Sequence, residues 1–336
     1  MSSLLKSRTP INLRDLLSIL VTVKPQRTVD PKFVFVVNYK NMIELIIPFR
    51  TANIGAFDVR RVLPFRKRRS VGPFVFVDDF GPVEIVKGAS MDVLPHPHIG
   101  LATVTYLFSG RMTHRDNIGS VQVIEPGEVN WMTAGRGVVH SERTSDAGNQ
   151  IGKPLIGLQT WVAMPENLEE SEPAFFHHAS DELPIIEGDG SVVKLILGNA
   201  FGMSSPVAAV SQPFYAECTL SANSVLTLPQ HINERSAYIL DGELMIDDRV
   251  FGPGNLIVFI EGTNVDIKAI GDAKFMLLGG DRLEKPRYMW WNFVSSRPEL
   301  VEQARIDWRD GNFAPIPNET GFIPLPEGNF PKSSPL

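Results

Sequence analysis

The sequence predicts an all-β protein of two jelly-roll β-barrels in tandem, followed by a short C-terminal helix. The first observation is a series of short runs of β-branched and aromatic residues, each ended by a glycine or proline turn. The second is composition, because 27 glycines and 26 prolines in 336 residues are typical of a turn-rich β protein. The third is an approximate repeat: residues 238–242 match the pattern of residues 106–110, and a Pro-Gly turn follows each segment.

Residues 1–41 differ in composition from the rest of the chain. They contain seven Lys or Arg and only two acidic residues, around a short apolar run at 16–21. This composition loosely resembles an organelle presequence, but no clear cleavage pattern follows the apolar run. We therefore favour a natural translation start at Met42. The expected divisions are a basic extension at 1–41, a metal-binding barrel at 42–172, a metal-free barrel at 185–290, and a helix with a proline-rich tail at 291–336.

The segment before residue 95 contains a basic run and a predicted strand. Four consecutive basic residues at 66–69 can form a nuclear import or polyanion patch. The acidic chain favours a solvated turn at this place instead. Residues 71–80 are mostly apolar and predict a buried strand that ends at Gly81 and Pro82.

Residues 95–144 carry two pairs of potential metal ligands. His96 and His98 form one pair, and His140 and Glu142 form the other. Residues two apart in a strand point to the same face, so each pair can act as a bidentate donor. If neighbouring strands carry the pairs, three imidazoles and one carboxylate converge at one point inside the barrel.

The segments around these pairs predict an antiparallel meander. Gly135 and Gly137, just before the second pair, allow the backbone to bend sharply close to a site. The predicted strands are 102–108, 121–124, 129–132 and 155–162.

Three neutral histidines and one carboxylate suit a single divalent transition metal with one or two open positions. Fe(II) is the expected ion, with Mn, Ni, Cu and Zn as alternatives. A purely structural metal is disfavoured, because structural sites are typically closed tetrahedra of cysteine and histidine.

These motifs resemble the cupin pattern and, more specifically, the pirin family of quercetin 2,3-dioxygenase-like bicupins. Many cupins place a ligand carboxylate a few residues after the His-x-His pair. Thr103 occupies that part of the strand here and Glu142 supplies the carboxylate, a displacement that the pirin pattern shares. The resemblance covers roughly residues 42–280. The matching segments are 60–64, 95–98, 103–106, 131–142 and 157–161.

The resemblance implies oxidative ring cleavage of a flavonol such as quercetin by O2, with release of carbon monoxide. Glu142 would be both a metal ligand and the catalytic base that accepts the substrate hydroxyl proton. The expected partners are thus a small aromatic chelating substrate and O2. The alternative is a non-enzymatic, iron-dependent regulatory protein that resembles a transcriptional cofactor, with a redox-sensing metal and a protein partner. A stress or metabolic protein with vestigial catalysis is a third possibility.

The remaining histidines of the first half receive lesser roles. His114 is interpreted as a surface hairpin residue, with a place on the pocket rim as the alternative. His177 and His178 are adjacent and would face opposite sides of a strand, so they chelate poorly as a pair. We interpret residues 165–184 around them as the linker out of the first barrel. Trp131 is assigned either to the core or to the pocket wall, as is its neighbour Met132.

The second half repeats the barrel plan without its ligands. Its only histidine is His231, and one histidine cannot hold a transition metal firmly. Further on, apolar residues at 300, 301, 304 and 308 predict a helix that ends before Gly311. We expect this helix to cover a barrel edge and residues 312–336 to be largely extended or loose.

Composition excludes several classes of function. A net charge of −6 argues against direct nucleic-acid binding through a basic surface. The single Cys218 excludes an intrachain disulfide and a multi-cysteine zinc site. It fits a reducing compartment such as the cytoplasm, or the nucleus of a eukaryote. No apolar run approaches the roughly 20 residues of a transmembrane helix, so we expect no membrane partner. A monomer is expected.

Overall fold

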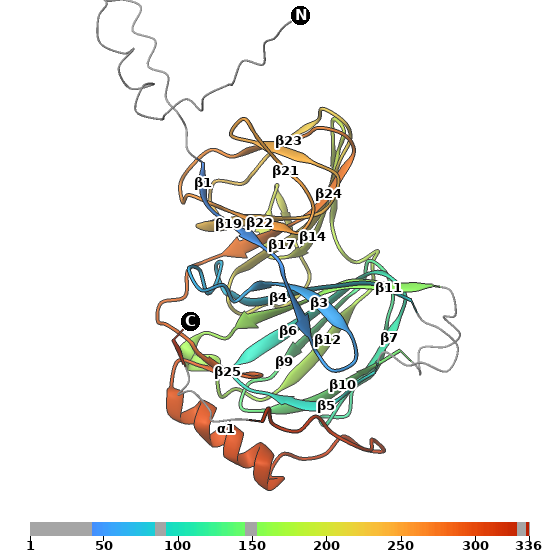
Figure 1. The fold of residues 1–336 in the computed structure, drawn as a ribbon, viewed down its shortest axis with the longest axis vertical. Coiled ribbons are helices and arrows are strands. Elements are labelled where there is room, and N and C mark those ends of the chain that lie inside the picture. The colour runs from blue at the N-terminus through green and yellow to red at the C-terminus, as the bar shows by residue number, and fades with distance from the viewer. Residues whose placement is uncertain (1–41, 85–91, 145–152, 328–333, 336) are drawn as a thin grey trace, which may run out of the picture. The chain divides into compact units, whose positions relative to one another are not determined.

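The computed structural model describes residues 42–84, 92–144, 153–327 and 334–335. They form two antiparallel β-barrels in tandem and one short C-terminal α-helix (Figure 1), which confirms the predicted fold class. The basic extension at 1–41 lies outside the described residues. Among those described, no helix has the length and hydropathy of a transmembrane span.

The first barrel is built from two sheets. The larger has the order β12 (Ala174–His178), β9 (Val129–Thr133), β6 (Leu101–Ser109), β11 (Pro154–Ala163), β4 (Phe74–Glu84), β3 (Asp58–Leu63) and β2 (Arg50–Asn53). The smaller has the order β5 (Val93–His98), β10 (Val138–Arg143), β7 (Met112–Asp116) and β8 (Val121–Ile124). The predicted strands of the meander are therefore confirmed. They form because β-branched and aromatic side chains pack well on a half-buried pleated surface.

The second barrel repeats this arrangement. Its larger sheet has the order β1 (Ile43–Pro48), β22 (Asn255–Phe259), β19 (Glu234–Asp241), β24 (Ala273–Gly280), β17 (Pro213–Leu220), β14 (Ser191–Leu197) and β13 (Ile185–Gly188). Its smaller sheet has the order β18 (Val225–Thr227), β23 (Asp266–Ala269), β20 (Leu244–Ile246) and β21 (Arg249–Phe251). Strands β15 (Asn199–Ala200) and β16 (Met203–Ser204) form a separate pair.

The first strand of the described chain belongs to the second barrel. β1 pairs antiparallel with β22, with Ile46 opposite Ile257. The sequence division had assigned residues 42–48 to the first barrel, so this assignment is wrong. A strand's partner depends on how the sheet closes, which the strand's own residues do not specify.

At the interface between the barrels, a tyrosine of each barrel donates a hydrogen bond to a carboxylate of the other. Tyr238 of β19 donates a hydrogen bond to Asp79 of β4 at 2.6 Å. Tyr106 of β6 in turn donates to Glu217 of β17. Both tyrosine rings lie in one apolar core that contains residues of both barrels, and a buried hydroxyl needs such a partner.

The basic run at 66–69 is only partly the solvated turn that was predicted. Arg66 and Lys67 are exposed. Arg68 instead forms ion pairs with Glu44 of β1 at 2.9 Å and with Glu234 of β19 at 2.8 Å. This arginine therefore ties the turn to two strands of the second barrel.

The predicted end of the buried strand at Gly81 is also wrong, because β4 continues to Glu84. Gly81 has φ +98°, and a Cβ at this position would lie 2.2 Å from the Leu155 carbonyl oxygen of β11. Only glycine permits this conformation and this close approach, so here it keeps the strand paired.

The supposed linker after the first barrel contains a 3₁₀ turn, Glu166–Leu168, and strand β12. β12 pairs with β9 and extends the larger sheet of the first barrel. The linker interpretation is thus wrong for residues 174–178. The acidic residues that suggested a linker precede β12, whose own sequence is Ala-Phe-Phe-His-His at the edge of the sheet.

The C-terminal segment returns to the first barrel. It forms β25 (Tyr288–Trp290), β26 (Phe293–Ser295), helix α1 (Pro298–Asp310) and β27 (Ser334–Pro335). Proline in the first helical turn accounts for the start of α1, and Gly311 at φ 75° accounts for its end, which was predicted. The helix buries Val301 and Ala304 and contacts β25 and β26, near β5 (Figure 1).

The described residues that follow the helix, 311–327, are held to the first barrel. The Trp308 indole donates a hydrogen bond to the Ile323 carbonyl at 3.0 Å, and the Ile323 amide donates to the Pro95 carbonyl at 2.8 Å. Glu319 pairs with Arg143 and accepts a hydrogen bond from Ser141. Residues 319–323 are therefore attached to the two strands that carry the predicted ligands.

Candidate metal centre

The two predicted ligand pairs lie on neighbouring antiparallel strands. His96 and His98 belong to β5, and His140 of β10 is directly opposite His96. The chain enters β10 through a tight turn at Gly135, where φ is +51° and a Cβ would lie 2.1 Å from the Ser171 carbonyl oxygen. The pairing of β5 with β10 is irregular between His140 and Glu142.

The three histidines converge through their Nε2 atoms. One donor atom from each lies within 4.8 Å of the others, and the Nε2 atoms of His98 and His140 are 3.1 Å apart. His96 Nδ1 donates to the Leu94 carbonyl at 2.8 Å, which leaves its Nε2 as the free donor. In the described part of the chain, no other set of three or more histidine, cysteine or acidic residues is arranged in this way.

Burial keeps these rings neutral. It lowers the pKa of His96 to about 4 and holds the pKa values of His98 and His140 well below their usual range. Neighbouring histidines add to the effect for His98 and His140, since like charges disfavour protonation. Three neutral, buried imidazoles whose donor atoms lie close together match the nitrogen ligands that transition metals bind, so these residues fit such an ion.

Glu142 lies beside this group rather than within it. Its Oε1 is 3.1 Å from the Thr105 hydroxyl, which is also 2.7 Å from Gln159 Oε1. A hydroxyl has one proton and can donate to only one of these oxygens at a time. Burial raises the pKa of Glu142, so this carboxylate is a stronger base than an exposed glutamate.

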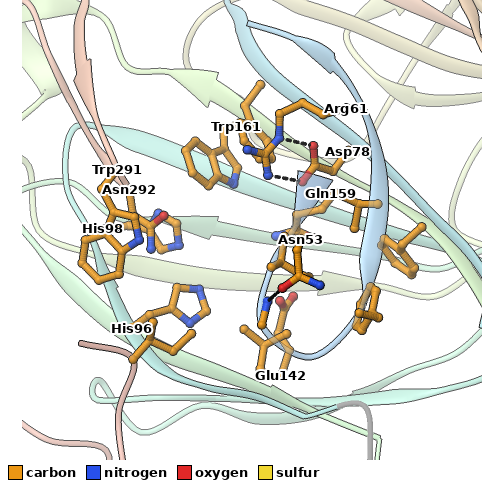
Figure 2. A pocket seen from close by; sticks show the side chains of 18 of the residues that line it. Asn53, Arg61, Asp78, His96, His98, Glu142, Gln159, Trp161, Trp291 and Asn292 are labelled. Carbon is orange, nitrogen blue, oxygen red and sulfur yellow. Dashed lines mark hydrogen bonds and ion pairs between the residues drawn. The ribbon is translucent and has the colours of Figure 1, made fainter. Parts of the chain in front are cut away.

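A cavity of about 500 Å³ opens onto His96 and His98. Figure 2 shows His96, His98 and Glu142 around one part of it and the Arg61–Asp78 pair in another. Both bonds of this bidentate pair are 2.7 Å long. The cavity is also lined by Asn53, Phe76, Trp161, Trp291, Asn292, Ile323 and Pro324.

The wall of the cavity is aromatic and rigidly packed. The rings of Phe76 and Trp161 are stacked, with centroids 3.9 Å apart and an interplanar angle of 11°. The Arg61 guanidinium lies 4.4 Å above the Phe76 ring. A flat, apolar surface with a few fixed polar groups is typical of a small-molecule pocket.

Comparison with known proteins identifies the family. Models of the Pirin domain and the Pirin C-terminal cupin domain match residues 56–162 and 215–314. A pirin-like protein of Caulobacter vibrioides is 46% identical over 290 residues, which are 85% of this chain and 100% of that protein. The chain belongs to the pirin family. Pirin of Homo sapiens is 31% identical over 270 residues, covering 78% of this chain and 89% of that protein.

The pirin fold is also found among solved structures. A quercetin 2,3-dioxygenase from Acinetobacter baumannii matches with a TM-score of 0.79 and 31% identity, covering 87% of this chain and 97% of that one. The resemblance to pirins and the bicupin architecture are thus confirmed.

His114 is the clearest correction to the sequence analysis. It is 4% exposed, and its Nδ1 is 3.4 Å from His140 Nδ1, so it is not a surface hairpin residue. Its ring stacks on Phe175 of β12. The burial was missed because β12 had been assigned to a linker. The alternation of His114 and Asp116 along β7 was the available indication, because it repeats the i, i+2 spacing of the ligand pairs.

The other residues in question have structural positions. Trp131 is fully buried in the core and donates to Thr133 Oγ1 at 2.9 Å, while Met132 lies in a second core cluster. His177 and His178 bind different partners, Asn130 and Glu182.

His231 of the second barrel is exposed and lies 3.0 Å from the Asn199 carbonyl oxygen. That the second barrel binds no metal stays a prediction.

Proposed function

We propose that this pirin-family protein is a metal-dependent dioxygenase that cleaves a flavonol such as quercetin, or a related aromatic enediol, with O2. The observation that carries the proposal is the convergence of three neutral histidines, two of which line a cavity with stacked aromatic walls. A relative of known structure that is 31% identical is named as a quercetin 2,3-dioxygenase, which supports the choice of substrate class.

The ligands in this proposal are His96, His98, His140 and Glu142. Nitrogen and oxygen donors without sulfur suit Fe(II), our preferred ion, and also Mn, Ni, Cu or Zn. A bound ion would supply Lewis acidity and a path for electrons between the substrate and O2. Glu142 completes the set by a side-chain rotation, since its carboxylate lies in the same cavity.

Glu142 is the proposed general base. A flavonol binds a metal best after it loses its 3-hydroxyl proton, and a buried carboxylate with a raised pKa can accept that proton. Thr105 directs a hydroxyl at Glu142 Oε1 and is itself adjacent to Gln159. The Thr105 hydroxyl can therefore serve the carboxylate in its present position or turn to Gln159 when Glu142 rotates.

The cavity wall orients the substrate in this proposal. Trp161 and Phe76 offer a continuous flat surface for a planar ring system, and Trp291 lines the same cavity. Both Arg61 hydrogen bonds to Asp78 keep the guanidinium in place on this wall. Ring cleavage then incorporates both oxygen atoms of O2 into the ring-opened ester, and one carbon leaves as carbon monoxide.

The test is oxygen uptake and carbon monoxide release with quercetin. Protein stripped of metal and reloaded anaerobically with Fe(II), Mn, Ni or Cu should consume one O2 and release one carbon monoxide per flavonol. Protein with both His96→Ala and His140→Ala is the control for free metal. Absence of uptake with every loaded metal would contradict the enzyme. Recovery of a specific protein in a pull-down from native extract would then favour the regulatory alternative.

A further inference from the structure

A second row of polar side chains lies directly behind the proposed metal centre. Strand β7 pairs with β10 on the side opposite to β5, so that Asp116 is across from His140 and His114 is across from Glu142. His114 is 4% exposed and Asp116 is 1% exposed.

The hydrogen bonds of Asp116 define the proton position on His114. Asp116 Oδ1 accepts backbone N–H groups from Ser120 at 2.8 Å and from Ile118 at 3.2 Å. Asp116 Oδ2 lies 3.0 Å from His114 Nε2. An ionised carboxylate can only accept hydrogen bonds, so Nε2 of His114 must carry a proton. In the tautomer with this single ring proton, Nδ1 has a lone pair.

This lone pair faces His140. The two Nδ1 atoms are 3.4 Å apart, and one of them must donate. In this tautomer His114 Nδ1 has no proton and accepts, so His140 Nδ1 carries a proton and Nε2 of the neutral His140 ring does not. His140 Nε2 is the atom that lies 3.1 Å from His98 Nε2 at the centre.

We propose that Asp116 and His114 are positioning residues that fix His140 in the tautomer whose Nε2 can bind a metal. The proposal rests on the metal centre proposed above and extends it to a chain of three side chains, Asp116, His114 and His140. Phe175 stacks on His114 with centroids 4.3 Å apart and holds the ring plane in line with both partners. His96 obtains the same tautomer more simply, from the Leu94 carbonyl.

The first measurement is the metal affinity of the full chain. Co(II) and Zn(II) dissociation constants are measured by chelator competition for the parent, Asp116→Asn and Glu182→Gln. Asparagine can donate from its NH2 group to His114 Nε2, so the proton of His114 moves to Nδ1. His114 Nδ1 then donates to His140 Nδ1, and the proton of His140 moves to Nε2, the atom that would bind the metal. We expect 10- to 100-fold weaker binding in Asp116→Asn, the usual effect of losing such a partner. Glu182→Gln removes an equivalent carboxylate–histidine pair at His178 and should change affinity less than twofold.

The second measurement reads the tautomer directly. Long-range ¹H–¹⁵N spectra of histidine-labelled, metal-free parent protein should show His140 protonated on Nδ1. Protonation on Nε2 would overturn the proposal even if every Asp116 variant failed to fold, and even if the parent bound no metal. Unchanged metal affinity in a folded Asp116→Asn protein would also overturn it.

A third measurement separates positioning from ligation. In the Cu(II)-loaded proteins, the nitrogen couplings in the electron paramagnetic resonance spectrum should be the same for the parent and for His114→Gln. Loss of one nitrogen in His114→Gln would show that His114 is itself a ligand, and the proposal would be wrong.

Discussion

Glu142→Gln separates metal binding from proton transfer. Glutamine keeps the shape of the side chain and one oxygen that can accept from Thr105, whose hydroxyl is 3.1 Å from Glu142 Oε1. It loses the negative charge and the ability to take a proton. Since burial already disfavours the charged form of Glu142, the metal-free variant should be no less stable than the parent. Partial metal retention is expected, because the three histidines remain.

The expected loss of turnover is about 10²-fold or more, the usual scale for a lost general base. This corresponds to about 2.7 kcal/mol in the activation free energy. Thr105→Val is a matched variant, because it keeps the carboxylate and removes only its hydroxyl donor. Its loss should be smaller, about 10-fold, since a hydrogen bond to a carboxylate contributes roughly 1.5 kcal/mol.

The assay is O2 uptake with quercetin at matched metal occupancy. Equal rates for the parent and Glu142→Gln would refute the role of Glu142 as the base. If Glu142→Gln instead lost thermal stability in proportion to lost metal, and the parent had little activity, the metal would be structural. A changed affinity for a protein partner without oxygen uptake in either form would support the regulatory alternative.

Three further predictions concern the histidines. His96→Ala or His140→Ala should remove most of about one metal ion per chain, measured by elemental analysis, and a double variant with full occupancy would contradict the site. His231→Ala should leave metal content and oxygen uptake nearly unchanged, whereas loss of metal would reveal a site in the second barrel. Burial gives His96 a folded pKa of about 4, against an unfolded value of about 6.5. The stability that this histidine contributes is thus complete above pH 6.5 and is lost as the pH falls toward 4, by about 2 kcal/mol between pH 7 and pH 5. Denaturant unfolding of the metal-free parent and of His96→Gln at both pH values checks this, and equal pH dependence would refute it.

The sequence predicted the strands and the convergence of His96, His98 and His140 because both depend on local patterns. His96 and His98 share a strand face through their i, i+2 spacing, and this is a property of any extended chain. His114 has the same kind of spacing from Asp116, yet its burial could not be predicted. It depends on Phe175, whose strand lies some 60 positions later in the chain and pairs in the other sheet.

Local sequence patterns also could not predict which strands β1 and the segment after the helix contact. β1 completes a sheet of the second barrel, and Ile323 is bound to the barrel through a backbone hydrogen bond to Pro95. Backbone hydrogen bonds carry almost no sequence information, because nearly every residue can donate and accept them. Proline-rich composition indicated an extended tail correctly, but it could not indicate what the tail contacts.

Asp78 and Asp79, two adjacent residues of β4, indicate how the second barrel supports the site in the first barrel. Successive side chains of a strand face opposite sides. Asp78 therefore faces the cavity, where it binds Arg61, while Asp79 faces the interface and binds Arg60 and Tyr238. The Tyr238 hydroxyl of the second barrel thus holds the face of β4 that points away from the cavity.

Any shift of β19 would thus move the strand that holds Asp78 and Phe76 against the cavity. Tyr106 makes the reciprocal contact, from the strand that carries Thr105 to Glu217 of the second barrel. Along β4, alternation places Phe76 of the aromatic wall and Asp79 of the interface on opposite faces. Along β6, it does the same for Thr105, which contacts the proposed base, and Tyr106 of the interface. The base and the wall thus both depend on the interface between the barrels. The second barrel then supports the site by holding two of its walls in register, a role that requires no histidine.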